Sequence, residues 1–184
     1  MGMPAPLQEY YTVADVLALP SDGNRYELAY GKLLVSPSPV FRHQTVLARL
    51  YRVVADYCEA TGVGLALFAP ADITWGRDDV LMQPDLFVIP QDEVHLRDWA
   101  AFRAIPFVAE VLSPSTRSHD RFDKRRVYQD RGVGCCWIVD AANAQVEVWT
   151  PEAQFPVVER ERVSWWPAGA SSPLVIDLAW LFAD

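Results

Sequence analysis

The sequence predicts one mixed α/β (α+β) domain in which helices pack against a β-sheet. The chain has 184 residues, which suits a single domain of ordinary size. Hydrophobic residues make up 51% of it, which is enough to build a packed core. Helical patterns are followed by several strand-like runs, then by a second helix and further strands. No linker divides the chain, so we expect a single domain over residues 1–184.

The N-terminal part should contain a short helix, a hairpin and a long helix. Thr12 is a suitable N-cap for a helix over residues 12–19, because Asp15 stands three positions later. Residues 25–35 have the strand residues of a hairpin, with Tyr30-Gly31 at its turn. Apolar residues recur every third or fourth position over residues 42–60, which predicts the longest helix. The proline-rich first ten residues are expected to be frayed.

The rest of the chain should be mainly strands, with one further helix among them. Residues 105–112 are mostly apolar, as in a central strand that is covered on both faces. We expect strands at residues 64–68, 73–75, 80–89, 105–112, 135–140 and 145–150, and helices at 120–131 and 177–182.

Charge and cysteine content limit the possible functions. There are 16 Lys and Arg residues against 24 Asp and Glu residues, so the net charge is −8. Bulk positive charge therefore cannot attract nucleic acid, and a phosphate ligand would need a local basic patch or a metal ion. Cys58, Cys135 and Cys136 form neither a disulfide framework nor a zinc motif. With no membrane span and no signal peptide, these features predict a cytoplasmic protein.

Two acidic residues interrupt the apolar strands. Asp85 and Glu110 lie within or at the edge of such runs, where an ionised carboxylate is costly without a partner. If the two strands pair with these residues adjacent, the carboxylates converge at one sheet edge and suit Mg²⁺ or Mn²⁺. In the competing interpretation Asp85 caps a turn and Glu110 pairs with one of fourteen arginines.

Six blocks of residues resemble a known nuclease superfamily, the PD-(D/E)XK nucleases with the restriction endonuclease-like fold. The closer resemblance is to the Uma-type restriction endonuclease family, which is common in bacteria. It covers roughly residues 10–150 and leaves 151–184 as a C-terminal extension. The blocks are Arg25-Tyr26-Glu27-Leu28, Ser36-Pro37-Ser38-Pro39, Arg42-His43-Gln44, Gln83-Pro84-Asp85-Leu86, Glu110-Val111-Leu112-Ser113-Pro114-Ser115-Thr116 and Lys124-Arg125-Arg126-Val127-Tyr128.

The resemblance implies an endonuclease that hydrolyses DNA phosphodiester bonds with a divalent metal ion. Asp85, Glu110 and the backbone carbonyl of Val111 would bind Mg²⁺ or Mn²⁺, which would polarise the phosphodiester and activate a water. The superfamily pattern places a lysine two residues after the glutamate, but Leu112 occupies that position. Only Lys32 and Lys124 are available. Lys124 lies on the following helix, from which some superfamily members supply the lysine.

Several further residues are candidates for the site, each with a competing structural role. Glu27 would bind a second metal ion or orient water, or else face solvent. His43 would approach phosphate or transfer a proton, or else be structural. Lys124 itself could be a solvated partner of Asp120. The other candidates lie on the helix of Lys124. Tyr128 would hold the lysine or touch phosphate, or else be a packed core residue. Arg121 and Arg125 would form a phosphate-binding patch, or else a solvated face of the helix.

Three functional hypotheses follow from the sequence. The first is a metal-dependent endonuclease acting on DNA. The second is a catalytically inactive homologue that kept the nuclease fold and acts as a binding or regulatory protein. The third is self-association through tryptophans of the C-terminal part, which is compatible with a homodimeric nuclease. These tryptophans are Trp137, Trp149, Trp165, Trp166 and Trp180.

Overall fold

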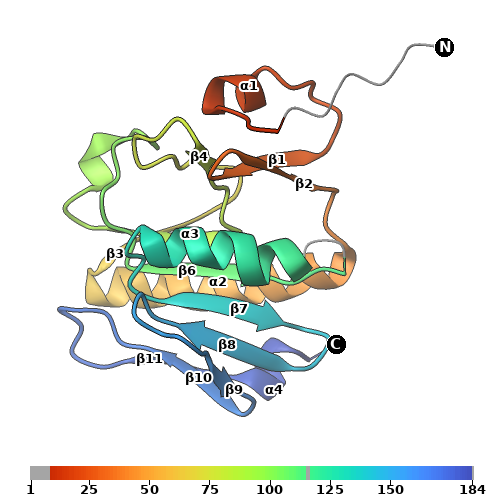
Figure 1. Cartoon of the computed structure of the whole chain (residues 1–184). Coiled ribbons are helices and arrows are strands. Elements are labelled where there is room, and N and C mark those ends of the chain that lie inside the picture. The colour runs from red at the N-terminus through yellow and green to blue at the C-terminus, as the bar shows by residue number, and fades with distance from the viewer. Residues whose placement is uncertain (1–8, 115–116, 184) are drawn as a thin grey trace.

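A six-stranded mixed sheet forms the centre of the domain (Figure 1). The computed structural model describes residues 9–114 and 117–183, so most of the segment expected to be frayed lies outside the described residues. β6 and β7 run parallel and every other neighbouring pair is antiparallel. The strand order is β3 (Gly64–Phe68), β5 (Leu86–Pro90), β6 (Phe107–Val111), β7 (Cys136–Asp140), β8 (Gln145–Trp149) and β9 (Val157–Glu159).

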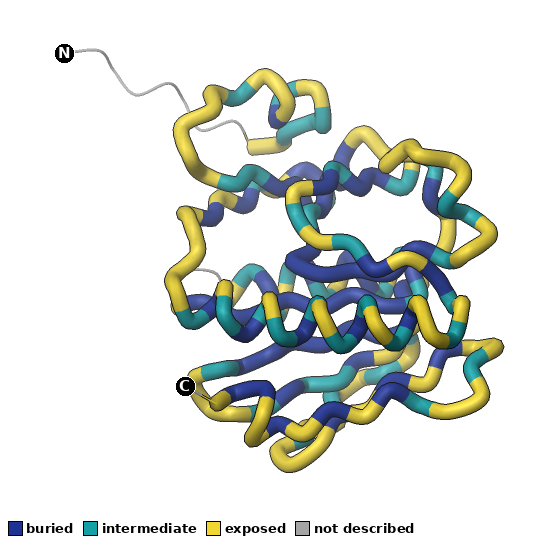
Figure 2. The backbone as a smooth tube through the Cα atoms, turned by 180° about the vertical axis from the view of Figure 1, so that it is seen from behind, coloured by how far each residue is buried: buried dark blue, intermediate teal, exposed yellow. Residues whose placement is uncertain are grey.

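Helices cover both faces of this sheet, which confirms the predicted layered α/β class. The α2 helix (Phe41–Thr61) packs on one face through apolar residues at three- and four-residue spacing. The α3 helix (Arg125–Asp130) and the π-helical segment η2 (His119–Lys124) cover the other face. Alternate residues of each strand enter opposite cores, and the most deeply buried backbone runs along the central strands (Figure 2).

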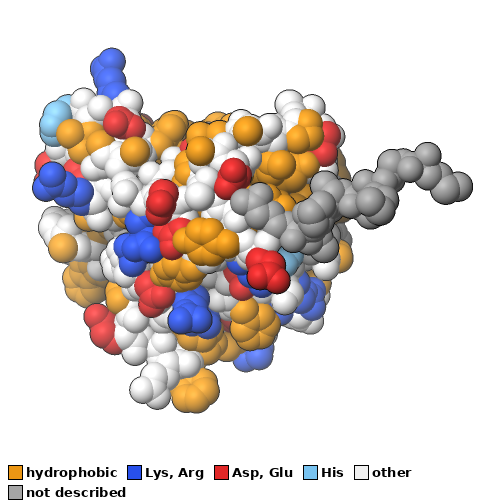
Figure 3. Space-filling model, turned by 45° about the horizontal axis from the view of Figure 1, so that its top comes forward, with side chains coloured by type: hydrophobic (Ala, Val, Ile, Leu, Met, Phe, Trp, Pro, Cys, Tyr) orange, Lys and Arg blue, Asp and Glu red, His pale blue; other side chains and the backbone are white. Residues whose placement is uncertain are grey.

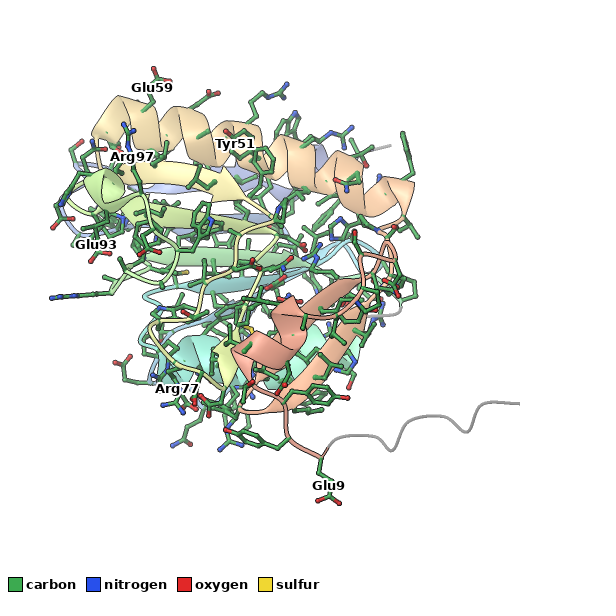
Figure 4. The ribbon with its side chains drawn as sticks, turned by 90° about the horizontal axis from the view of Figure 1, so that it is seen from above. Glu9, Tyr51, Glu59, Arg77, Glu93 and Arg97 are labelled. Carbon is green, nitrogen blue, oxygen red and sulfur yellow. The ribbon has the colours of Figure 1, made fainter. Side chains whose placement is uncertain are left out.

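A smaller three-stranded sheet lies beside the main sheet, above it in Figure 1. Its order is β2 (Lys32–Ser36), β1 (Arg25–Ala29) and β4 (Val80–Leu81), and β1 and β2 form the expected hairpin. The short helix α1 (Val13–Leu17) packs Val16 against Leu28 and Leu81. Only a short loop joins β2 to α2, so the hairpin lies near the N-terminal end of that helix. Glu59, labelled in Figure 4, marks the other end of α2.

The C-terminal part belongs to the same core. β9 extends the main sheet, and a two-stranded sheet of β10 (Arg162–Trp165) and β11 (Leu174–Asp177) joins the core cluster of α2. The α4 helix (Leu178–Leu181) follows, and Arg42 of α2 donates to the backbone carbonyl of Ala183 at 3.0 Å. Trp137, Trp149 and Trp165 are core residues, whereas Trp166 and Trp180 are exposed. A homodimer through them stays a prediction.

The structure corrects three expected elements and adds four that the sequence did not predict. The strand predicted over residues 80–89 is broken into β4 and β5, because Pro84 cannot donate to a ladder. Residues 73–75 contribute a single bridge from Ile73 to Met82 rather than a strand. The helix expected from residue 120 starts as a π-helix at His119, and a 3-10 turn, η1 (Val94–Leu96), follows β5. β9, β10 and β11 were not predicted.

Two absences bear on the sequence-based expectations. Among the described residues, no helix combines the length and apolar character that a membrane crossing requires. Cys58, Cys135 and Cys136 are buried and free, as expected. The cytoplasmic location itself stays a prediction.

The predicted cap of α1 forms a capping box. Its removal tests how much this helix, which packs on the smaller sheet, contributes to stability. The Thr12 hydroxyl accepts from the backbone N–H of Asp15, whose carboxylate accepts from the Thr12 backbone N–H at 2.8 Å. We expect Thr12→Ala to lower the free energy of unfolding by about 1 kcal/mol. Thr12→Ser keeps the hydroxyl and should stay close to the wild type in urea denaturation. Equal stability of both variants would contradict this account of the helix.

Candidate active site

Asp85 and Glu110 lie on neighbouring strands and are almost completely buried. The antiparallel register of β5 and β6 sets Leu86 opposite Ala109, which carries Asp85 to the level of Glu110. Asp85 directly follows the Gln83-Pro84 break that separates β4 from β5, and Glu110 lies in a strand with all five residues buried. Their exposed fractions are 3% and 1%. The structure thus brings together the two carboxylates that the sequence singled out.

Asp85 is held as a carboxylate by three donors. Arg25 Nη1 lies 2.9 Å from Oδ1, while His43 Nε2 lies 2.9 Å from Oδ2 and the backbone N–H of Val111 donates to Oδ2 at 3.0 Å. Burial raises the pKa of Asp85, but the hydrogen bond with His43 and the charges of Arg25 and Lys124 outweigh burial. The pKa therefore lies well below its usual range, and Asp85 is ionised at neutral pH.

Glu110 meets a lysine and a tyrosine from the helix that follows β6. Lys124 Nζ lies 2.8 Å from Glu110 Oε1, and the Tyr128 hydroxyl donates to the same oxygen. Burial raises the pKa of Glu110, the charge of Lys124 lowers it, and the neighbouring Asp85 and other carboxylates raise it again. The pKa of Glu110 therefore lies well above its usual value, in contrast to that of Asp85.

Lys124 lies among three carboxylates. Besides Glu110, its Nζ is 3.1 Å from Glu27 Oε2 and 3.6 Å from Asp120 Oδ1. Burial lowers the pKa of Lys124, but these carboxylates outweigh burial and raise it, so the amine stays charged. Only 2% of Lys124 and 1% of Glu27 is exposed. The solvated alternatives for both residues are therefore wrong.

The local structure around η2 explains how a lysine outside the strand reaches Glu110. A π-helical turn widens the backbone, and Asp120, Lys124 and Tyr128, each four residues apart, all face the sheet. Leu112 stands where the superfamily pattern expects lysine and is part of the apolar core. The amine thus comes from the next helix, while an apolar residue fills the usual position.

Three carboxylates, those of Asp85, Glu110 and Asp120, line a cavity of about 20 Å³. Glu27 joins them through its contact with Lys124, and we call Glu27, Asp85, Glu110 and Asp120 the acid cluster. Arg25 and Lys124 are cations that form ion pairs with it, and its four carboxylates outnumber these two cations. The cavity has room for about one water-sized group. Excess negative charge and oxygen donors around so small a space suit a divalent cation.

The donor set fits a metal ion that completes its coordination with water. In the described part of the chain, no group of three or more His, Cys, Asp or Glu side chains is arranged as a ready metal centre. Mg²⁺ commonly uses one or two carboxylates and keeps several waters, so Asp85 and Glu110 satisfy that chemistry. Val111 contacts Asp85 through its N–H, and the role of its carbonyl as a ligand stays a prediction.

Arg121 and Arg125 do not join the acid cluster. Arg121 Nη2 lies 2.8 Å from Asp140 Oδ2 and 2.7 Å from Glu147 Oε1. These ion pairs connect η2 to β7 and β8. The Arg125 guanidinium lies over the ring of Trp149, 4.4 Å from its centroid. Their substrate-binding role stays a prediction that no contact with the cluster supports. Ser115 and Thr116 of the most specific sequence block lie outside the described residues.

Two residues of the site were missed by sequence reasoning. Arg25 stands two positions before Glu27, so the two side chains share one face of β1. Asp120 stands four positions before Lys124 on the same helical face. Both spacings were visible in the sequence. His43 adds one more feature, because its buried Nδ1 has no hydrogen-bond partner among the described residues.

Comparison with known proteins identifies the family of this chain and a solved structure with a similar fold. The sequence model of the Uma2 family, described as “Putative restriction endonuclease”, matches residues 13–171. A crystal structure titled as “a putative nuclease belonging to DUF820” from Anabaena variabilis is similar with a TM-score of 0.78 and 22% identity. The match covers 94% of this chain and 97% of that chain. A search of curated proteins finds no match.

The two lysines of the chain allow a matched test of the acid cluster. Lys124→Met leaves Glu27, Glu110 and Asp120 facing one another without an amine, and we expect it to cost about 3–5 kcal/mol of unfolding free energy. Lys32 pairs with Asp123 at the surface, so Lys32→Met should cost less than about 1 kcal/mol. Urea denaturation at neutral pH measures both. Similar losses would show that Lys124 does not balance the cluster.

Proposed function

Because the chain belongs to the Uma2 family of restriction-endonuclease-like proteins, we propose that it is a divalent-metal-dependent endonuclease that hydrolyses DNA phosphodiester bonds. One observation carries the proposal: Asp85, Glu110 and Lys124 converge on a single buried cavity from two strands and the following helix. A purely structural domain has little use for this arrangement, because it buries charges that apolar side chains could replace at lower cost.

Asp85 and Glu110 would hold Mg²⁺ or Mn²⁺, with the backbone carbonyl of Val111 as a third protein ligand. When bound, the metal would polarise the scissile phosphodiester and lower the pKa of an attacking water. When its four carboxylates are ionised, the acid cluster carries more negative charge than Arg25 and Lys124 balance, and a divalent cation would offset this excess, which supports the assignment. Tyr128 fixes the orientation of Glu110, and Arg25 fixes that of Asp85.

Lys124 would stabilise the negative charge that develops on the phosphate. Its ammonium is held in place by Glu27 and Asp120, so little reorganisation is needed when charge develops beside it. Glu27 is itself anchored, because its Oε1 accepts from the backbone N–H of Gln83 at 2.8 Å. Glu27 would therefore act by positioning the amine, and we keep the second-metal role as the alternative for this residue.

His43 would accept the proton of the attacking water. Its Nε2 hydrogen bond with the ionised Asp85 favours the tautomer in which Nε2 carries the proton and Nδ1 carries the lone pair. Nδ1 is buried and unpartnered among the described residues, and His43 lines the cavity of the acid cluster. A buried polar atom of this kind normally has a partner, which substrate or its attacking water would supply here.

DNA binding would depend on the site rather than on the whole surface. On the face shown in Figure 3, Lys and Arg side chains alternate with Asp and Glu and form no continuous basic surface. With a net charge of −8, the protein offers little phosphate neutralisation outside the site. Catalysis and binding should therefore both weaken sharply when the divalent cation is removed.

Cleavage of plasmid and single-stranded DNA with Mn²⁺ or Mg²⁺ tests the function directly. We expect cleavage by the wild type, its loss with EDTA, and a loss of at least about 100-fold in Asp85→Asn, since even groups that only support a metal ligand are commonly worth 10- to 100-fold. Asp123→Asn, at the surface pair with Lys32, is the control and should cleave normally. Wild-type protein that binds DNA but never cuts it would favour the inactive regulatory homologue.

A histidine pair tests the proton acceptor. His43→Gln keeps an amide donor near Asp85 but removes the basic nitrogen, so the cleavage rate should fall by about 100-fold or more at saturating substrate. His95→Gln, in the exposed turn η1, should leave it unchanged. Thermal unfolding of both variants checks that the fold is intact. A folded His43→Gln variant with wild-type turnover would remove His43 from the mechanism.

A further inference from the structure

A second, larger cavity adjoins the cavity of the acid cluster. It is an open pocket of about 480 Å³, bounded by the segment from α1 to β1, the proline loop 37–39, the start of α2 and residues 69–72. We call it the side pocket. Arg25, Pro37 and Pro39 line both cavities, so a single layer of residues separates them. Its volume lies within the range of about 300–1,000 Å³ that is typical of small-molecule sites.

The same two short segments supply residues to both cavities. On α2, His43 lines the cavity of the acid cluster and the next residue, Gln44, lines the side pocket. On the other side, Asp85 and Gln83 flank Pro84 and line the two cavities in the same way. Along both segments, a residue of the acid-cluster cavity thus lies within two positions of a residue of the side pocket.

The lining of the side pocket is polar but nearly uncharged. Among the described residues that form it, only Arg25 and Asp72 carry charge. The Arg25 guanidinium already donates to Asp85 and to the Gln83 carbonyl, and Asp72 accepts from the Gln83 side-chain amide at 2.8 Å. A phosphate group would need free cations here. The pocket instead suits a flat, neutral ligand with several hydrogen-bonding groups.

Its remaining side chains match the chemistry of a nucleobase. Tyr26, Pro37 and Pro39 offer an aromatic ring and apolar rings for stacking contacts. Gln44 carries an amide, which both donates and accepts hydrogen bonds as base edges require. The amides of Asn24 and Gln83 each donate to a carboxylate, Asp22 at 3.1 Å and Asp72 at 2.8 Å, and present their oxygens as acceptors. We propose that the side pocket binds the nucleobase next to the scissile phosphate, so that the substrate presents an unpaired or extruded nucleotide. The proposal rests on the nuclease function for the position of that phosphate.

The substrate class follows from the groups that line the side pocket. Its rings and amides would contact the face and the edge of a base, and in a duplex these are covered by stacking and pairing. Enzymes that bind a base in such a pocket act on single strands or turn the nucleotide out of the duplex. A strand with an unpaired nucleotide at the cut should therefore be a better substrate than a fully paired duplex.

Abasic scanning tests the proposal with an oligonucleotide of fixed sequence. A single abasic site is moved along the strand around the cut, and cleavage with Mn²⁺ is measured at each position. We expect one position adjacent to the cut to lose about 5- to 150-fold in kcat/KM, which is what one stacked base is worth. Equal rates at all positions, or faster cleavage of the fully paired duplex, would overturn the proposal while leaving the nuclease function intact.

A glutamine pair provides the matched variants. Gln44→Ala should lower kcat/KM for the intact strand at least about 5-fold and reduce the abasic penalty, whereas Gln91→Ala, after β5, should do neither. Gln44→Ala with an unchanged abasic penalty would overturn the proposal.

Binding separates the two proposals if the wild type cuts nothing. Anisotropy of a labelled hexathymidylate and of its singly abasic counterparts is then compared between the wild type and Gln44→Ala. Weaker binding of one abasic strand, lost in Gln44→Ala, would support the side pocket although the nuclease function had failed. Identical binding of all strands to both proteins would overturn it.

Discussion

The contact between the Lys124 ammonium and three buried carboxylates is the interaction on which the domain's architecture depends. Glu27 comes from the hairpin, Glu110 from the central sheet, and Asp120 from η2, so one charged group joins the small sheet, the large sheet and the helix layer. Removing these charges from water is costly, and only close geometry with further hydrogen bonds offsets that cost. Tyr128 and the backbone N–H of Gln83 provide those bonds.

Local patterns in the sequence predicted which charged residues form the site better than they predicted which residues each of them contacts. Asp85 and Glu110 stood out as acids within apolar runs, and only two lysines could replace the one missing at Leu112. The inward direction of Glu27 was not decided by alternation, because it depends on how the hairpin docks on the larger sheet. Long-range packing of this kind leaves no periodic signal in the sequence.

The same limit explains the errors in the fold. The long helix α2 and the hairpin follow from spacing alone, and both were predicted. The π-helical start of η2 depends on contacts with the sheet. The strands β9 to β11 are short, and β10 and β11 pack their apolar residues into the core cluster of α2. The ion pairs of Arg121 with Asp140 and Glu147 could not be foreseen either, because these partners are distant from it in sequence.

The shared walls of the two cavities restrict how this protein could be engineered. A change of backbone length near His43-Gln44 or Gln83-Pro84-Asp85 would shift groups of both cavities together. Single side-chain replacements at Gln44 or Gln83 leave the backbone in place and alter one wall only. Laboratory evolution toward altered ligand preference should therefore accumulate point substitutions in these segments, whereas insertions and deletions should be found in more distant loops.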